Sequence, residues 1–363
     1  MNFRLHSFLC LLSMWLLWAA PANGQLKYCN ADDFPLYGKI SEQTETRYER
    51  LPAALRTVSR LPVWELGKHT AGLFLRFRTN TTTIGLMWSL YENSIMSHMA
   101  LTGIKGFDLY CLENGAWYFA GAAQPAANAM DNTATVITNM DGSEKEMMLY
   151  FPLYDGVTAL QIGIDSAAFI APPAVAAPVR EKPVICYGTS ILQGGCASRP
   201  GMAHTNILSR RLNREFINLG FSGNGQLDYE IAEIIAAREA ALIILDFVPN
   251  ASVQQMQEKM EQFYDIIRAK QPLTPILFIE DPPFPSGRYN RVLQREVEDK
   301  NKTVREIFDR IKAKGDAFIE FIPSEPMIGA DCEATVDGIH FTDLGFMRYA
   351  GYLEPYIKKY VRQ

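Results

Sequence analysis

From about residue 183 onward the chain alternates between two kinds of segment, and this alternation restricts its fold more than any other feature. The apolar runs are PVICY, EFINLG, ALIILDFV, PILFIE and AFIEFI. Between and after them lie longer amphipathic stretches, near residues 203–213, 228–239, 251–270, 288–314 and 343–361. Strands that are apolar on both faces are buried on both faces, so we expect a parallel sheet with helices on each side.

Residues 29 to 171 follow a different pattern, with short alternating runs broken by Gly, Asn and Asp. Examples are GLFLRFRT, TIGLMWSL, KGFDLYCL, AWYFAGAA, EMMLYFPL and ALQIGIDS. Such runs are typical of the antiparallel strands of a β-sandwich, and helical periodicity is nearly absent. The segment 171–183 shows neither pattern and is predicted to be a linker. The sequence therefore predicts an all-β sandwich domain over residues 25–175 and an α/β domain over residues 180–363.

The start of the chain, residues 1–24, is predicted to be a signal peptide. Arg4 precedes an apolar stretch from Phe8 to Ala20, and Ala22 and Gly24 fit the −3 and −1 positions of a cleavage site. An uncleaved membrane anchor is the alternative, but this stretch is short for a bilayer span. We expect export to the periplasm or the extracellular space, with no membrane insertion after cleavage.

Charge and cysteine content exclude several other classes of protein. The net charge of −5 gives no reason to expect nucleic acid as a partner. The cysteines beyond residue 24 are irregularly spaced and form no CxxC motif or His/Cys cluster along the sequence. We therefore expect no disulfide framework, no metal and no cofactor. A bridge between Cys196 and Cys332, in predicted loops, stays open as an alternative for an oxidising compartment.

Residues with side-chain or backbone groups suited to catalysis follow the apolar runs of the second half of the chain. They are Ser190 in GTSI, Gly223 in NLGFSGNG, Asn250 in DFVPNAS, and Asp337 and His340 in DGIHFTDLGF. Ligands of parallel sheets bind beyond the carboxyl ends of the strands, so we expect these residues to gather at one edge.

The residues at this edge have the chemistry that acyl transfer requires. A serine hydroxyl such as that of Ser190 needs a neighbouring base to become a nucleophile. His340 can be this base if Asp337 fixes its tautomer and stabilises its charged form. The backbone N–H groups of Ser190 and Gly223 and the side-chain amide of Asn250 would then stabilise the developing oxyanion.

Each of these residues also has a simpler explanation. Ser190 could be a turn residue, Asn250 a helix cap, and the Gly-rich stretch after Asn218 a phosphate cradle, although no GxxxxGK[ST] pattern exists. Ser222 in GFSGN is the rival nucleophile, and His204 is the rival base on a predicted helix. Four motifs in this order at one sheet edge favour the catalytic explanation.

The four motifs resemble the sequence blocks of the SGNH (GDSL-type) hydrolase superfamily, which carry Ser, Gly, Asn and His in that order. The third block departs from the usual GxND form around Asn250, and Thr189 stands where Asp is frequent in the first block. KGFDLY at 105–110 is similar to the GxDLY signature of an N-terminal domain found in one branch. The resemblance implies a β-sandwich followed by a flavodoxin-like three-layer α/β/α domain, in exported bacterial esterases or deacylases.

The sequence thus predicts a metal-independent serine esterase acting on an acylated small molecule or glycan, with acetyl groups on a carbohydrate as the first choice. A lipid or aryl ester is the alternative within this class. A non-catalytic glycan-binding protein on a hydrolase scaffold is the alternative from another class. A glycosidase using Glu280 and Asp281 is disfavoured, because adjacent residues rarely point at the same atom. A loop near residues 93–103, containing His98, is expected as one potential cover for the catalytic edge.

Overall fold

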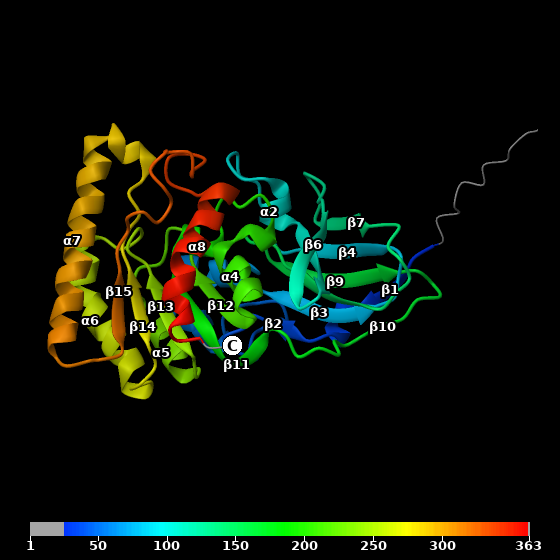
Figure 1. The fold of residues 1–363 in the computed structure, drawn as a ribbon, viewed down its shortest axis with the longest axis horizontal. Coiled ribbons are helices and arrows are strands. Elements are labelled where there is room, and N and C mark those ends of the chain that lie inside the picture. Colours follow the sequence, from blue (N-terminus) through cyan, green and yellow to red (C-terminus); the bar gives the residue numbers. More distant parts are fainter. Residues whose placement is uncertain (1–24, 362–363) are drawn as a thin grey trace, which may run out of the picture.

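The computed structural model describes residues 25–361, so the predicted signal peptide lies outside the described residues. A β-rich domain is followed by an α/β domain, and the two lie side by side in Figure 1. This arrangement confirms the predicted fold class. None of the helices within residues 25–361 combines the length and apolar character that a membrane span requires.

The first domain consists of two antiparallel sheets with strand orders β1-β9-β4-β7 and β10-β3-β8-β5-β6, and β2 pairs with β3. The strands are β1 (Lys27–Asn30), β2 (Leu36–Tyr37), β3 (Phe74–Thr79), β4 (Ile84–Leu90), β5 (Phe107–Glu113), β6 (Ala116–Ala123), β7 (Asp131–Ile137), β8 (Lys145–Tyr150), β9 (Val157–Ile164) and β10 (Ile170–Ala171). Leu75 and Phe77 of β3 pack into the core together with Leu86 of β4, while the intervening side chains face the other way. This period of two is the alternation seen in the sequence.

Short helices in the first domain correct the expectation that helices are nearly absent there. They are η1 (Ala31–Asp33), η2 (Ala53–Thr57), α1 (Leu61–Lys68) and α2 (Leu101–Lys105). Pro62 stands in the first turn of α1, where proline is tolerated. Val63 and Trp64 of α1 pack into the core of the second domain. The apolar face of this helix therefore serves a contact between domains, which the local sequence pattern does not reveal.

The second domain is built on a parallel sheet of order β12-β11-β13-β14-β15, the flavodoxin-like order. Its strands are β11 (Val179–Gly188), β12 (Arg214–Gly220), β13 (Leu242–Asp246), β14 (Ile276–Ile279) and β15 (Ile319–Ile322). Its helices are α3 (Ser190–Gln193), η3 (Pro200–Met202), α4 (His204–Leu212), α5 (Tyr229–Ala237), α6 (Val253–Lys270), η4 (Pro285–Arg288), α7 (Arg291–Ala313) and α8 (Asp343–Lys358). Each predicted apolar run forms one of these strands.

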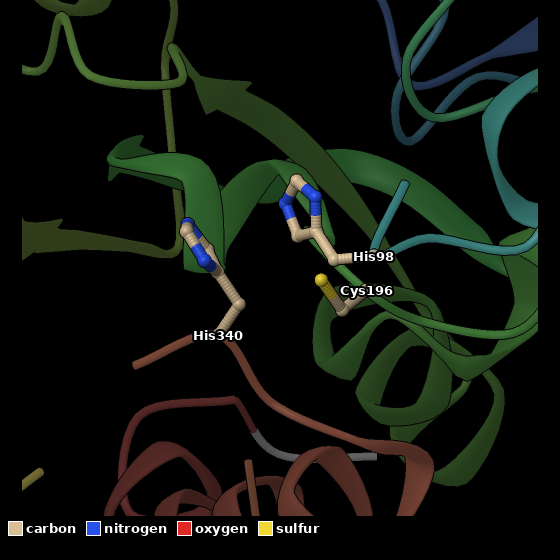
Figure 2. A group of neighbouring side chains, drawn as sticks. All are labelled: His98, Cys196 and His340. Carbon is tan, nitrogen blue, oxygen red and sulfur yellow. The ribbon is translucent and has the colours of Figure 1, made fainter. Parts of the chain in front are cut away.

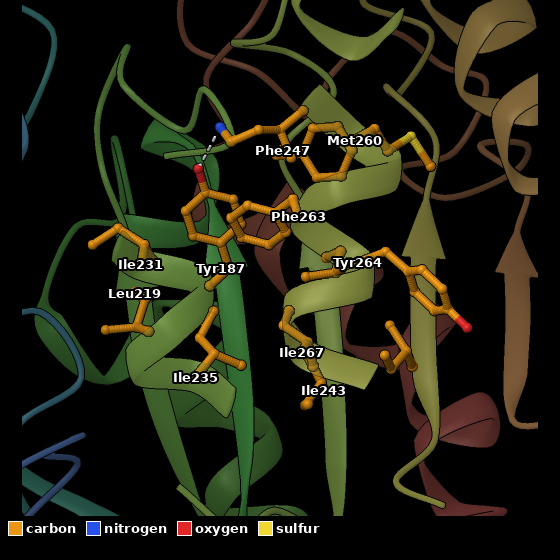
Figure 3. Close-up of a cluster of buried hydrophobic side chains, with 14 of the residues drawn as sticks. Tyr187, Leu219, Ile231, Ile235, Ile243, Phe247, Met260, Phe263, Tyr264 and Ile267 are labelled. Carbon is orange, nitrogen blue, oxygen red and sulfur yellow. Dashed lines mark hydrogen bonds between the residues drawn. The ribbon is translucent and has the colours of Figure 1, made fainter. Parts of the chain in front are cut away.

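Helices cover both faces of this sheet, which explains why its strands are apolar throughout. Ile185 and Tyr187 of β11 face a core shared with α5, α6 and α7, part of which Figure 3 shows. Val184 and Cys186 face the opposite core, shared with α4 and α8. The carboxyl ends of the strands consequently form the exposed edge on which polar residues are placed.

The segment between the two domains is shorter than the predicted linker 171–183. Strand β11 begins at Val179, which pairs with Arg214 of β12, and the register shifts before Val184. The Pro183 position falls within this shift. The first residues of β11 are thus paired with β12 irregularly, which agrees with the lack of a strand pattern in this part of the sequence.

Two buried charged side chains join the domains. Arg50 of the first domain donates hydrogen bonds to the carbonyl oxygens of Asn218 and Gly220, at 3.0 and 2.9 Å, at the end of β12. Asp108, in the KGFDLY segment, accepts a hydrogen bond from Arg199 at 2.7 Å. Burial raises the pKa of Asp108, and Arg199 opposes this effect. These contacts fix the first domain against the end of β12 and against the segment that follows α3.

Candidate active site

Ser190 is the first residue of α3, directly after the turn that ends β11 at the carboxyl edge of the parallel sheet. A Cβ atom on Gly188 would lie 2.2 Å from the carbonyl oxygen of Asp246, so only glycine fits at the end of this strand. Thr189 then caps α3, because its Oγ1 accepts a hydrogen bond from the Ile191 N–H at 3.3 Å. The strand, turn and cap together place the Ser190 hydroxyl on a cavity of about 430 Å³.

A chain of hydrogen bonds links Ser190, His340 and Asp337. The Ser190 Oγ lies 3.0 Å from Nε2 of His340, and Nδ1 of His340 lies 2.8 Å from Oδ2 of Asp337. Oδ1 of Asp337 accepts from the backbone N–H groups of Ile339 and His340. Partial burial raises the pKa of Asp337, but the hydrogen bonds from His340 and the backbone outweigh it and lower the pKa to about 2.

The charge of Asp337 settles which nitrogen of His340 carries the proton. An ionised carboxylate can only accept a hydrogen bond, so Nδ1 of His340 must donate. In the neutral ring Nε2 then has the free lone pair, and it faces the Ser190 hydroxyl. This arrangement can take a proton from the hydroxyl.

Three hydrogen-bond donors on the same cavity have no partner among residues 25–361. They are the backbone N–H groups of Ser190 and Gly223 and the side-chain NH2 of Asn250. Gly223 has a φ of 67°, and a Cβ there would meet nothing within 4 Å, so its backbone borders open space. The Asn250 Oδ1 accepts from the Gly225 N–H at 3.3 Å, which leaves the NH2 for the cavity. Asn250 is not a helix cap, because Ser252 caps α6.

The rival nucleophile and rival base lie in unsuitable surroundings. Ser222 lines the cavity, but within the described chain no histidine nitrogen bonds its hydroxyl, and its N–H donates to Gln193 at 3.0 Å. His204 is buried against Phe346 and Tyr349. Burial lowers the pKa of His204 to about 3. The geometry therefore favours Ser190 and His340.

The sequence reasoning missed a polar wall of the cavity, formed by Asp281, Glu296 and Lys300. Asp281 is 1 % exposed and its Oδ1 has no partner within the described residues. Burial raises the pKa of Asp281 well above its usual range, although Lys300 opposes this. Lys300 pairs with Glu296 at 2.7 Å. The sequence signal was the position of Asp281 shortly after β14, and the neighbouring Glu280 pairs with Arg305 instead.

The loop between β4 and α2 reaches the site from the first domain. His98 lies beside His340, with ring centroids 5.6 Å apart, and Figure 2 shows both rings near Cys196. Cys196 and Cys332 are free thiols, so the alternative of a bridge between them is wrong in this structure. Trp88 of β4 is buried in the core of the first domain.

Asp246, at the end of β13, is a second buried carboxyl, and its backbone lies beside Gly188 of β11. The Tyr349 hydroxyl donates to its Oδ2 at 2.9 Å. Burial raises the pKa of Asp246 to about 7, and the bond from Tyr349 opposes the rise. The pKa of an unfolded aspartate is about 3.9. Asp246 therefore contributes stability that is fully present below about pH 4 and is lost as the pH rises through about 7.

We expect Asp246→Asn to remove this pH dependence. The unfolding free energy of the variant minus that of the wild type should rise between pH 4 and pH 7, because only the wild type has a carboxyl to ionise there. Urea unfolding at a series of pH values measures the difference. Asp309→Asn, at an exposed position of α7, is the control for the loss of a surface carboxyl. A difference for Asp246→Asn that does not vary with pH would contradict the prediction.

Comparison with known proteins gives matches over both domains. Residues 181–358 match the GDSL-like lipase/acylhydrolase family, and residues 26–170 match the GxDLY family, the N-terminal part of SGNH hydrolase-type esterases. A structure described as a GDSL-like lipase from Bacteroides ovatus is 34% identical, with a TM-score of 0.88 over 93% of this chain and 98% of that one. The chain belongs to the GDSL-like hydrolase family. It is an ester-hydrolysing enzyme, as predicted.

More distant structures share the fold of this GDSL-like hydrolase. A salicylyl-acyltransferase from a tetracycline biosynthetic pathway is 16% identical, with a TM-score of 0.74 over 92% of this chain and 97% of that one. A family two carbohydrate esterase from Clostridium thermocellum, in complex with cellohexaose, is 12% identical, with a TM-score of 0.54 over 80% of this chain and 92% of that one. A comparison with curated proteins gives no match.

Proposed function

We propose that this GDSL-like hydrolase is an exported serine esterase that removes small acyl groups, acetyl foremost, from carbohydrates. The observation that carries the proposal is the hydrogen-bonded chain from Ser190 through His340 to Asp337, on a cavity that also presents unpaired donors. A non-catalytic glycan-binding protein would have no need of this arrangement. Export is supported by the signal-peptide pattern of residues 1–24.

The reaction proceeds through an acyl-enzyme. The Ser190 Oγ attacks the ester carbonyl carbon while Nε2 of His340 takes the hydroxyl proton. The oxyanion accepts hydrogen bonds from the N–H groups of Ser190 and Gly223 and from the Asn250 amide. The intermediate collapses, the C–O bond to the alcohol breaks, and His340 protonates the departing alcohol. Water, activated by His340, then attacks the acyl-enzyme and releases the carboxylic acid and Ser190.

The shape and polarity of the cavity support a short acyl group on a hydroxylated alcohol. The cavity volume is about 430 Å³, and Phe284, Leu293 and Ile339 provide an apolar side for the acyl group. A hollow of about 820 Å³ adjoins it and is lined by polar residues that include Arg295 and Asp299. Polar side chains of this kind bind the hydroxyl groups of sugars. The fold is also that of the family two carbohydrate esterases.

The test compares three substrates with the purified protein: an acetylated polysaccharide, 4-nitrophenyl acetate and a 4-nitrophenyl ester of a long-chain acid. We expect release of acetate from the polysaccharide and a kcat/KM for the long-chain ester well below that for the acetate. A preference for the long chain would support a lipid esterase instead. Binding of the polysaccharide with no turnover of any ester would support the glycan-binding alternative.

A further inference from the structure

Three side chains with metal-binding atoms converge beside Ser190. His98, Cys196 and His340 each offer a ligand atom, and these atoms lie within 4.8 Å of one another. Figure 2 shows the two imidazole rings and the thiol facing a common space. The residues come from three separate loops, so their spacing in the sequence gives no metal motif. Imidazole nitrogen and cysteine sulfur are preferred ligands of Zn²⁺.

The surroundings of His340 suit a metal ligand. Its Nδ1 is bonded to the Asp337 carboxylate, which leaves Nε2 as the nitrogen that a metal can use. In zinc sites a ligating histidine usually donates its other N–H to a carboxylate or carbonyl group, which fixes the ring and raises its basicity. The hydrogen bond that prepares His340 to accept a proton therefore also prepares it to bind zinc.

Packing between the domains holds the other two ligands near His340. A Cβ on Gly103 would lie 2.2 Å from the carbonyl oxygen of Ala197, so helix α2 approaches the Cys196 segment as closely as glycine allows. Thr102 donates to the Ser198 carbonyl at 2.5 Å, and the Cys196 N–H points to the Met99 sulfur at 3.4 Å. Met99 is the neighbour of His98, so these contacts place the His98 loop against Cys196.

Only a small movement would bring the three atoms to zinc distances. Ligands of tetrahedral zinc at 2.0–2.3 Å from the metal are separated by roughly 3.3–3.8 Å, compared with at most 4.8 Å here. His98 is exposed and can supply this movement by rotating its side chain. Three protein ligands would leave a fourth position for water or for the Ser190 hydroxyl.

We propose that His98, Cys196 and His340 form a zinc site and that bound Zn²⁺ inhibits the enzyme reversibly. The lone pair on Nε2 of His340 cannot hold the metal and accept the Ser190 proton at the same time. The inhibition rests on the proposed role of His340 as the base, whereas metal binding itself does not.

The first experiment measures 4-nitrophenyl acetate hydrolysis by the whole protein, first freed of metal and then titrated with ZnCl2. We expect zinc to inhibit the wild type and EDTA to restore its activity. His98→Ala and Cys196→Ala, each measured relative to its own metal-free rate, should need at least about tenfold more zinc for the same fractional inhibition. Cys332→Ala, which removes an exposed thiol, should keep the sensitivity of the wild type. Insensitivity of the wild type, stimulation by zinc, or unchanged sensitivity in both variants would overturn the proposal.

A second experiment reads metal binding without catalysis. Co²⁺ can take the place of Zn²⁺, and a bond between Co²⁺ and a thiolate adds a strong charge-transfer absorption band to the spectrum. Ser190→Ala titrated with Co²⁺ should show this absorbance with one equivalent bound, and Ser190→Ala/Cys196→Ala should not. No absorbance in the first variant would overturn the site even if the esterase activity is established. Absorbance that depends on Cys196, in a protein that hydrolyses no ester, would uphold the site and contradict only the proposed function.

Discussion

Ser190→Ala is expected to lower kcat for 4-nitrophenyl acetate by about a thousandfold or more, because it removes the hydroxyl that we propose as the nucleophile. KM should change little, since the cavity walls and the Gly223 and Asn250 donors stay in place. The small side chain at the start of α3 should not disturb folding. Steady-state kinetics measure the loss, and circular dichroism verifies that the variant is folded.

Ser222→Ala is the matched control for this experiment. Ser222 lines the same cavity but has no histidine partner in the described chain, so its replacement should change kcat far less than that of Ser190. Equal rates for the wild type and Ser190→Ala would eliminate Ser190 as the nucleophile. A large loss in Ser222→Ala would then identify the alternative.

Arg50→Met is expected to reduce the free energy of unfolding by at least about 3 kcal/mol. The Arg50 guanidinium is buried and donates to four carbonyl oxygens, those of Leu66, His69, Asn218 and Gly220. Methionine fills a similar volume but donates nothing, so these acceptors lose their partner within the interface. Each unsatisfied buried acceptor costs about 1–3 kcal/mol, and some regain water as the interface relaxes.

Urea unfolding followed by circular dichroism measures this destabilisation. Arg56→Met is the control, because Arg56 is exposed and its ion pair with Glu45 lies at the surface; such a pair contributes about 0–1 kcal/mol. An equal effect for both variants would show that the buried hydrogen bonds of Arg50 contribute little. The activity of the folded Arg50→Met protein should also fall. Arg50 holds the carbonyl of Gly220, and the chain continues from there to Gly223, whose N–H is a proposed oxyanion donor.

The sequence predicted the second domain well because its strands carry apolar side chains on both faces. It predicted the first domain less completely. Strand β7 (DNTATVI) was not among the expected runs, since it lies at a sheet edge and exposes several polar residues. Helix α1 was missed because its apolar face packs against another domain. Contacts between segments far apart in the sequence produce no local hydrophobic periodicity, so they cannot be recognised in a single sequence.

The same reasoning explains what could be predicted of the candidate site. Ser190, Gly223, Asn250 and His340 follow strands or precede the last helix, and parallel topology alone brings such positions to one edge. Their catalytic roles stay predictions. Lys300 lies within the long helix α7, and nothing in its sequence pattern distinguishes its cavity-facing side chain from solvent-exposed lysines. Likewise, the place of His98 depends on how the two domains pack.

The contact of Arg50 with the end of β12 also limits how this enzyme can change in evolution. If recombination gave the second domain a new N-terminal partner, the carbonyl groups of Asn218 and Gly220 would have to find another donor. The new partner would therefore need an equivalent cation at that point. The two gene segments are consequently expected to be inherited as one unit, and natural variety should appear in the loops around the cavity instead.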